Sequence, residues 1–337
     1  TERVSARFSR PRTPGAAPTD RKDKQDSMSK KSRRAASKRR AAAPAGSAQP
    51  AQSAQSAQSR PSTAPKKPRA AVAFVERPFE GLSAEAELVA MREILPLATL
   101  PATTTEEYGS ADVVLTTILP SMAGALRRAD GVLLVAAQTV MSSGDASRDI
   151  AARIIDGIEL PDGQALQVSD LPEPGPRLQD VVASFGELEL HEIPSFWMTE
   201  EDAAKPENKE ALEDSRSQLV PMRAVVGVRG AFWCRMSREF VRWVRPEPRD
   251  AVLDGLARLR AADDFSFDDS RFVGAFRALG LIIPVWELPK GAEADELAAP
   301  MAEFGPKLDA AIAASDPLTP EEKRARAGIV SRQVTLR

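Results

Sequence analysis

The sequence predicts an α+β protein, in which a long basic arm precedes a globular body of mixed strands and helices. Three observations lead to this prediction. Residues 1–70 hold 18 Lys and Arg against 4 Asp and Glu, whereas the remainder holds 28 against 44. Large apolar side chains are almost absent from residues 1–70, so this segment cannot offset its chain entropy by burial and is expected to be disordered. Strand-like alternation and helix-like spacing of apolar residues begin only after it, in residues 71–337.

The arm is rich in Ala, Ser, Gln and Pro, and residues 48–59 repeat Ala-Gln-Pro/Ser four times. Its cations gather in two blocks, at 30–40 and 66–69. One interpretation is contact with the phosphates of RNA, DNA or the ribosome. The other is a solubilising tail, or an electrostatic contact with the acidic body. The candidate nucleic-acid-binding residues are Lys30, Lys31, Arg33, Arg34, Lys38, Arg39, Arg40, Lys66, Lys67 and Arg69.

The first half of the body, residues 71–200, is expected to alternate helices and strands. Acidic residues after Ser83 indicate a capped helix, and runs rich in Val, Leu and Ile indicate strands. Asp145 is a suitable N-cap for a helix whose Ile residues recur at helical spacing and which ends near Gly157. The expected elements are helices at 84–94, 121–128, 146–157 and 178–185, and strands at 112–119, 131–140 and 187–196.

A polar stretch at 200–214 separates this half from the second, residues 221–337. Alternation in 222–236 indicates two strands with Gly230 at a turn or bulge, and places Trp233 on the face opposite Cys234. Pro284 predicts an edge position or a bulge. A capping box with Pro at the first helical position opens the last helix at Thr319. The other expected elements are helices at 250–259, 271–279 and 297–312, and a strand at 281–288.

The two halves show a weak internal similarity. An Arg-Asp pair opens a helix in each, at 148–149 and 249–250, and the later landmarks follow at steadily shrinking offsets. We therefore predict two pseudo-repeats of a strand–strand–helix–helix–strand unit, at 112–197 and 222–287, followed by C-terminal helices. The architecture is α+β with or without a duplication.

The motifs of the common enzyme classes are absent. The chain has no G-x-x-x-x-G-K-[ST] loop, no G-x-G-x-x-G loop and no G-x-S-x-G elbow. Its one histidine, His191, shares a polar strand face with two glutamates, which favours a solvated over a catalytic role. Its one cysteine, Cys234, lies among apolar residues and is expected to be a buried thiol. We predict no catalytic residue, no metal site and no cofactor.

Three polar features have both a functional and a structural interpretation. Carboxylate pairs at 263–264 and 268–269 could act as acids and bases, but helix capping explains them more simply. The segment 144–149 could bind an anion, but a helix cap with an internal ion pair is the plainer interpretation. The Arg- and aromatic-rich strip at 223–249 resembles in composition a platform for single-stranded nucleic acid or a protein interface. The favoured interpretation is that its aromatics belong to the core and are bordered by solvated arginines that pair with the acidic body. Its candidate interface residues are Arg229, Trp233, Arg235, Arg242 and Trp243.

Several motifs together resemble an actinobacterial domain of unknown function. They are found at Phe74–Leu82, Gly144–Asp149, Pro176–Asp180, Phe232–Met236, Phe276–Leu281, Pro284–Trp286 and Arg324–Arg337. In relatives the domain often follows an SEC-C zinc motif, but the segment before Phe74 contains no Cys or His. The resemblance implies a cytoplasmic protein without an established activity, and it carries over no zinc site.

The function classes can now be ranked. No run of 18 apolar residues occurs, and a single cysteine suits a reducing compartment, so we expect a cytoplasmic protein without a membrane span. The leading hypothesis is a non-enzymatic protein that binds nucleic acid or the ribosome through its arm. The alternative is a protein-interaction or scaffold module. An enzyme with a site of carboxylates and arginines is the least favoured class.

Overall fold

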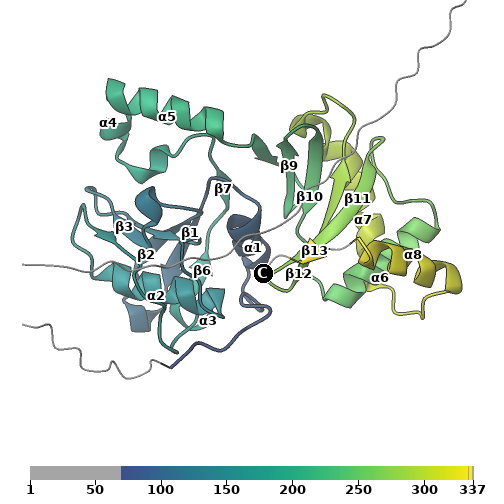
Figure 1. Ribbon diagram of the computed structural model, residues 1–337, viewed down its shortest axis with the longest axis horizontal. Helices are drawn as coiled ribbons and strands as arrows, with labels where there is room; N and C mark the ends of the chain where they lie inside the picture. The colour runs from purple at the N-terminus through teal and green to yellow at the C-terminus, as the bar shows by residue number, and fades with distance from the viewer. Residues whose placement is uncertain (1–69, 333, 336–337) are drawn as a thin grey trace, which may run out of the picture. The chain divides into compact units, whose positions relative to one another are not determined.

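The computed structural model describes residues 70–332 and 334–335, so the predicted arm, except for Ala70, lies outside the described residues. Two β-sheets with their helices account for the rest, and the predicted α+β class is confirmed (Figure 1). The first half contains α1 Glu85–Glu93, β1 Ala98–Thr104, β2 Asp112–Thr116, β3 Ala125–Arg127, β4 Leu133–Ala136, α2 Ala146–Ile158, β5 Ala165–Leu166, α3 Leu178–Val181, β6 Val182–Phe185 and β7 Glu189–Leu190. Helices α4 Glu200–Ala203 and α5 Pro206–Gln218 follow.

The second half is built around a sheet whose strands are mostly antiparallel. It contains β8 Met222–Ala224, β9 Ala231–Arg235, β10 Glu239–Trp243, α6 Arg249–Ala261, β11 Arg271–Ala278, β12 Leu281–Glu287, α7 Ala298–Ala313, α8 Pro320–Val330 and β13 Val334–Thr335. The strand order is β13-β11-β12-β10-β9-β8, with the β13–β11 pair parallel.

In the first sheet the strand order is β5-β3-β4-β2-β1-β6, and β7 also pairs with β1. Strand β1 was missed in the sequence because it contains Pro101. On the side away from β2, strand β1 pairs with two strands in turn. Ala98 and Thr99 pair with β7, and the pairing with β6 begins at Ala102 of β1. Pro101 falls in the gap between these two partners, where its missing N–H costs no ladder hydrogen bond.

Helices α1 and α2 cover one face of the first sheet. Leu88 and Met91 of α1 and Ile150 and Ile154 of α2 pack with strand residues such as Leu115 in one buried cluster. The opposite face is covered around Leu134 by the short 3₁₀ turn Ser195–Trp197. Both faces of this sheet are therefore protected over its central strands, and α2 is held firmly against it.

Helices α6, α7 and α8 cover one face of the second sheet (Figure 1). Trp286 of β12 is fully buried there, and four phenylalanines surround its indole. The other face of this sheet joins the core of the first half, because Phe232, Val244 and Ile283 belong to the same buried cluster as α1. Helix α1 thus lies between the two sheets, and the two halves share a core.

Local signals gave several elements correctly. Asp145 caps α2 and accepts hydrogen bonds from the backbone N–H groups of Ser147 and Arg148. Thr319 forms the predicted capping box at the start of α8. Ser83, in contrast, does not cap α1, since Ala84 occupies the N-cap position and makes no side-chain cap. The polar stretch after residue 200 is helical and mostly exposed.

Three predicted helices are wrong for the same reason. The segment 121–128 forms a 3₁₀ turn and then β3, which pairs with β4 and β5. The segment 178–185 makes one helical turn and then continues as β6 beside β1. The segment 271–279 is β11, which pairs along its length with β12. In each case a neighbouring strand offers backbone partners that outweigh the weak local helix preference.

The predicted repeat unit also changes. Because 271–278 is a strand, the segment 222–287 does not have the predicted order strand–strand–helix–helix–strand. A common ancestry of the two halves stays a prediction.

Two further expectations about strands also change. The strand expected at 187–196 is limited to β7. Pro284 lies in β12, which is an interior strand of the second sheet. Residues 285–287 after it pair with β10, and Ile282 before it forms an isolated bridge with Arg245.

Candidate functional site

The two tryptophans of the Arg- and aromatic-rich strip belong to the core. Trp233 and Trp243 are 2% and 4% exposed. The indole N–H of Trp233 donates to the carbonyl of Ala292, and that of Trp243 donates to the carbonyl of Arg229, each at 3.0 Å. Rings that are buried and already hydrogen-bonded cannot stack on bases, so an interface here would have to be made by the arginines alone.

Most of those arginines are paired with carboxylates. Arg229 contacts Glu87 at 2.6 Å, and Arg235 contacts both Glu239, at 3.1 Å, and Glu293. Arg223, Arg238, Arg245 and Arg249 each have a carboxylate partner as well. Arg242 instead approaches the sulfur of Met236 at 3.7 Å. The strip is therefore close to neutral at its surface. The ten predicted arm cations lie outside the described residues.

The N-terminus of α2 is a network of hydrogen bonds that joins three segments of the chain. The buried Asp145 caps the helix and pairs with the Nε of Arg177 at 2.6 Å. Arg177 also donates to the carbonyl of Pro78 at 2.8 Å. The Ser147 hydroxyl donates to Gln179 and accepts from the backbone of Leu178. The cap is the predicted one, but its ion pair is made with Arg177 and is not internal to the segment 144–149. The protein itself already fills the hydrogen-bonding positions of this helix end.

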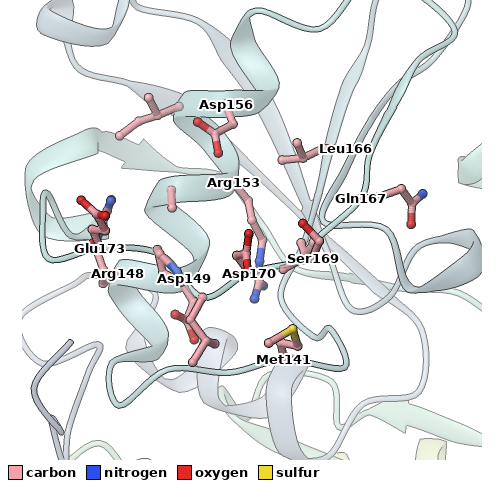
Figure 2. Close-up of a pocket in the computed structure, with 15 residues that line it drawn as sticks. Met141, Arg148, Asp149, Arg153, Asp156, Leu166, Gln167, Ser169, Asp170 and Glu173 are labelled. Atoms are coloured by element: carbon pink, nitrogen blue, oxygen red, sulfur yellow. The ribbon is translucent and has the colours of Figure 1, made fainter. Parts of the chain in front are cut away.

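A cavity of 380 Å³ lies along the adjacent face of α2, opposite the segment 166–173 (Figure 2). Figure 2 shows that Arg148, Asp149, Arg153 and Asp156 enter its lining from one helix. Asp149, Arg153 and Asp156 follow one another at intervals of four and three residues, which puts them on one side of α2. Across the cavity the lining includes Asp170 and Glu173.

Arg153 is the most unusual charge in this lining. Its side chain is buried, yet its guanidinium donates to the carbonyl of Ala136 at 2.9 Å and to the hydroxyl of Thr139 at 2.8 Å, not to a carboxylate. Burial lowers the pKa of Arg153 to about 10, Asp149 acts in the opposite direction, and Arg92 lowers it further. At neutral pH the group is still a cation, so it can attract an anion but not act as a base.

Asp149 complements Arg153 at the base of the cavity. It is 2% exposed, and its Oδ2 accepts from the backbone N–H of Ser143 at 2.9 Å. Its Oδ1 is buried and has no hydrogen-bond partner among the described residues. A buried carboxylate oxygen without a donor is costly, and a water or a ligand donor would satisfy it.

His191 is half-buried, so the prediction of a solvated ring is wrong. Its Nε2 lies 2.8 Å from the hydroxyl of Thr99, and its ring packs on Phe196. Burial lowers the pKa of His191, and Glu189 works against this shift. Glu189 approaches Nδ1 only to 4.0 Å, beyond hydrogen-bonding distance, and its carboxylate is mostly in solvent. With Thr99 buried in the sheet, the arrangement lacks both an oriented carboxylate and an accessible nucleophile.

Cys234 and the carboxylate pairs have structural positions. Cys234 is fully buried, as predicted, and burial raises the pKa of its thiol. The pairs at 263–264 and 268–269 do not cap a helix, because a strand follows them. Asp263, Asp268 and Asp269 have positive φ and shape turns instead. Lys307 contacts Asp264 at 2.9 Å. Within residues 70–332, no group of three or more His, Cys, Asp or Glu side chains could hold a metal ion.

Sequence reasoning missed the cavity and the Thr99–His191 contact. A signal for the cavity was present, since charged residues at 149, 153 and 156 recur at helical spacing beside an isoleucine stripe. Their partner segment, 166–173, was interpreted only as a loop. The Thr99–His191 contact could not be found, because it depends on the pairing of β7 with the missed strand β1.

Comparisons with known proteins place the chain in a family but give it no activity. No helix in the described part of the chain is long and apolar enough to cross a membrane. No curated protein and no solved structure matches the chain. Residues 78–337 match a family described as a "family of unknown function". Because the match covers most of the chain, including both sheets and the cavity, the protein belongs to this family, DUF5926.

Proposed function

We propose that the protein is a non-enzymatic, cytoplasmic RNA-binding protein whose basic arm makes the contact with RNA. The observation that carries this proposal is the distribution of net charge along the sequence. Residues 1–70 hold 14 more cations than anions, whereas the body holds 16 more anions than cations. A polyanion is attracted to the first segment and repelled by the second.

The structure of the body supports the arm as the contact site. The alternative platform, the strip at 223–249, has its tryptophans in the core and six of its seven arginines beside carboxylates. An arginine that must leave a carboxylate to bind a phosphate gains less free energy than one that is unpaired. The block at 30–40 contains seven cations and no carboxylate.

Enzymatic chemistry has less support. His191 and Cys234 do not line the 380 Å³ cavity, and the cavity's buried cation, Arg153, stays protonated at neutral pH. Catalysis there would depend on the carboxylates alone. We therefore place this cavity in a binding role rather than a catalytic one.

The test is a titration of full-length protein with labelled single-stranded RNA at several salt concentrations. If about half of the ten block cations engage, the slope of log K against log salt should be on the order of −3 to −4. Replacing the seven cations of the 30–40 block by Gln should weaken binding strongly and flatten this slope. The matched body variant, Arg223→Gln with Arg242→Gln, should leave both affinity and slope unchanged.

Two outcomes would contradict the proposal. If the body variant, not the arm variant, weakens binding, then the strip is the contact site. If the unmodified full-length protein does not bind RNA even at low salt, the nucleic-acid function is wrong and the scaffold hypothesis takes its place. A protein partner or self-association that is sensitive to salt and insensitive to nuclease would then be expected.

A further inference from the structure

The second sheet leaves part of one face uncovered. On its helix side, Val241 and Trp286 lie in the core formed with α6, α7 and α8. Neighbouring residues along each strand point to the opposite face, where Phe232 and Ile283 pack with α1. Helix α1 ends at Glu93, and a groove of 410 Å³ beside this residue is lined by β10, β11 and β12. The groove lies where α1 stops covering this face.

The floor of the groove is apolar. Phe240, Val273, Phe276 and Val285 are half-buried in its lining, and Met236 is 47% exposed. Large apolar side chains gathered on an open sheet face are typical of a binding surface rather than of ordinary protein surface. A ligand with an apolar part would remove these side chains from water.

A bulge in β11 adds to the lining. The register between β11 and β12 shifts between Phe272 and Gly274, which leaves Val273 as the extra residue. Gly274 has a φ of 154°, which favours glycine. Apart from its chain neighbours, a Cβ on Gly274 would meet only the carbonyl oxygen of Arg332 within 4 Å, at 3.6 Å. Bulges redirect side chains, and a glycine in a strand lets a ligand approach the backbone.

Two arginines of the lining have no carboxylate partner among the described residues. The guanidinium of Arg242 approaches only the sulfur of Met236, at 3.7 Å. Arg332, after α8, is exposed. A guanidinium in this state can bind an anion without first leaving a carboxylate, and it presents several N–H donors to it.

The carboxylates around the groove already have cationic partners. Glu93, in the lining, lies 4.0 Å from Arg92. Glu287, which is paired with Phe240 in the ladder, contacts both Arg238 and Arg271. These carboxylates therefore do not neutralise the two arginines of the lining, and the groove carries positive charge beside an apolar floor.

The backbone of the floor restricts the class of ligand. Strand β12 pairs with β10 on one side and with β11 on the other, so the N–H and C=O groups of the floor are used within the sheet. A peptide over this face would find no backbone partners there, whereas an alkyl chain needs none. The basic arm carries the wrong charge for the two arginines.

We propose that this groove is a binding site for small amphipathic carboxylates. The alkyl chain lies on the apolar floor, and the carboxylate is bound by Arg242 and Arg332. This site goes beyond the proposed function: it does not involve the arm, and it stands or falls independently of RNA binding.

Calorimetric titration of the full-length protein with hexanoate, octanoate and decanoate, each below its micellar concentration, tests the ligand class. Each CH₂ group that enters the groove should tighten binding about fourfold. The uncharged 1-octanol should bind roughly tenfold more weakly than octanoate, because it forms no charge-assisted hydrogen bond with the arginines. Equal affinity for octanoate and 1-octanol, or no binding of either, would overturn the proposal.

Arginine variants test the carboxylate contact. Arg242→Gln should weaken octanoate binding roughly tenfold. Arg332→Gln should weaken it roughly twofold to fivefold, since this side chain is exposed. Neither variant should change the affinity for 1-octanol, which also verifies that each is folded. Lys290→Gln removes an exposed cation outside the lining and should change nothing. An equal loss in all three variants would show a general charge effect and contradict the site.

Methyl NMR of the methionines locates the ligand. Octanoate should shift the Met236 signal, which is identified by its absence from Met236→Leu. Met301, fully buried on the helix side of the sheet, is the internal control and should not move. Shifts confined to other methionines would place the ligand elsewhere. A Met236 signal that does not respond, in a protein that sediments as a dimer, would show that a second copy of the chain fills the groove. Either result overturns the proposal.

Discussion

Two arginines buried to the same degree are stabilised in different ways in the two halves of the molecule. Arg153 on α2 is 4% exposed and donates to a carbonyl and a hydroxyl. Arg245, after β10, is 5% exposed but lies 2.5 Å from both Glu247 and Asp309, with Trp243 beneath its guanidinium. The charge of Arg245 is neutralised by formal negative charge, and that of Arg153 mainly by dipoles.

The difference shows which of the two cations is poised to respond to a ligand. Carboxylates that already contact a guanidinium leave little electrostatic field for a third group. At α2, the nearby carboxylate of Asp149 keeps a free oxygen, and burial lowers the pKa of Arg153 to about 10. Shifted pKa values of this kind cluster at functional sites, so Arg153 and not Arg245 is the candidate for a response to a ligand.

The variant Arg153→Met should have the largest effect. It removes the cation near the buried Asp149 and leaves the carbonyl of Ala136 without this donor. Each buried acceptor that loses its donor costs about 1–3 kcal/mol of unfolding free energy, and both Ala136 and Thr139 lose one here. Urea denaturation measures it. If the loss is below about 1 kcal/mol, the desolvation of Arg153 must already offset its interactions, and the proposed contrast with Arg245 disappears.

The matched variant Arg245→Met should cost less, about 1–2 kcal/mol. Its carboxylate partners are 31% and 61% exposed in their side chains, so water can replace the guanidinium. The remaining cost comes from the lost contact with Trp243. Denaturation of the two variants under identical conditions tests the comparison. A greater loss at Arg245 than at Arg153 would reverse it.

An element could be predicted from the sequence when the residues that determine it lie close together along the chain. The cap at Asp145 and the capping box at Thr319 were found, because both are set by residues within one helical turn. The strand at 271–278 was mistaken for a helix, because its identity comes from pairing with β12. Propensity is a weak guide where a neighbouring strand decides the conformation.

The residues of the candidate site differ in the same way, because some environments follow from sequence neighbours and others depend on distant segments. Burial of Cys234 followed from the apolar residues around it in the sequence. Core aromatics were the favoured interpretation of the strip, but the partner of Trp233 and the burial of His191 could not be derived, because the groups that cover these side chains come from distant segments. Trp233 donates to Ala292, and His191 contacts Thr99. The cavity likewise needs both α2 and the segment 166–173, which no local pattern connects.

Alkaline pH should sharpen the contrast further. Burial lowers the pKa of Arg153 from its ordinary value to about 10, so above pH 10 the unfolded chain still binds a proton that the folded chain has released. The contribution of this group to stability therefore rises as the pH rises through 10, by at most about 1.4 kcal/mol per pH unit. Wild type should gain stability relative to Arg153→Met between pH 9 and 11. A constant difference between these two proteins over this range would contradict the environment assigned to Arg153.

The smallest effect is expected at His191, where burial again disfavours a cation. The folded pKa lies below the unfolded value of about 6.5, so the unfolded chain takes up the proton first as the pH falls. The stability contributed by the neutral ring is therefore complete above about pH 6.5 and is lost as the pH falls through the folded pKa.

Because His191 is the only histidine, its ring signals in proton NMR report this pKa without assignment. Glu189→Gln removes the one nearby charge that raises the pKa and should shift the titration to still lower pH. A pKa above 6.5 in the wild type, or an upward shift in the variant, would show that the ring is solvated after all.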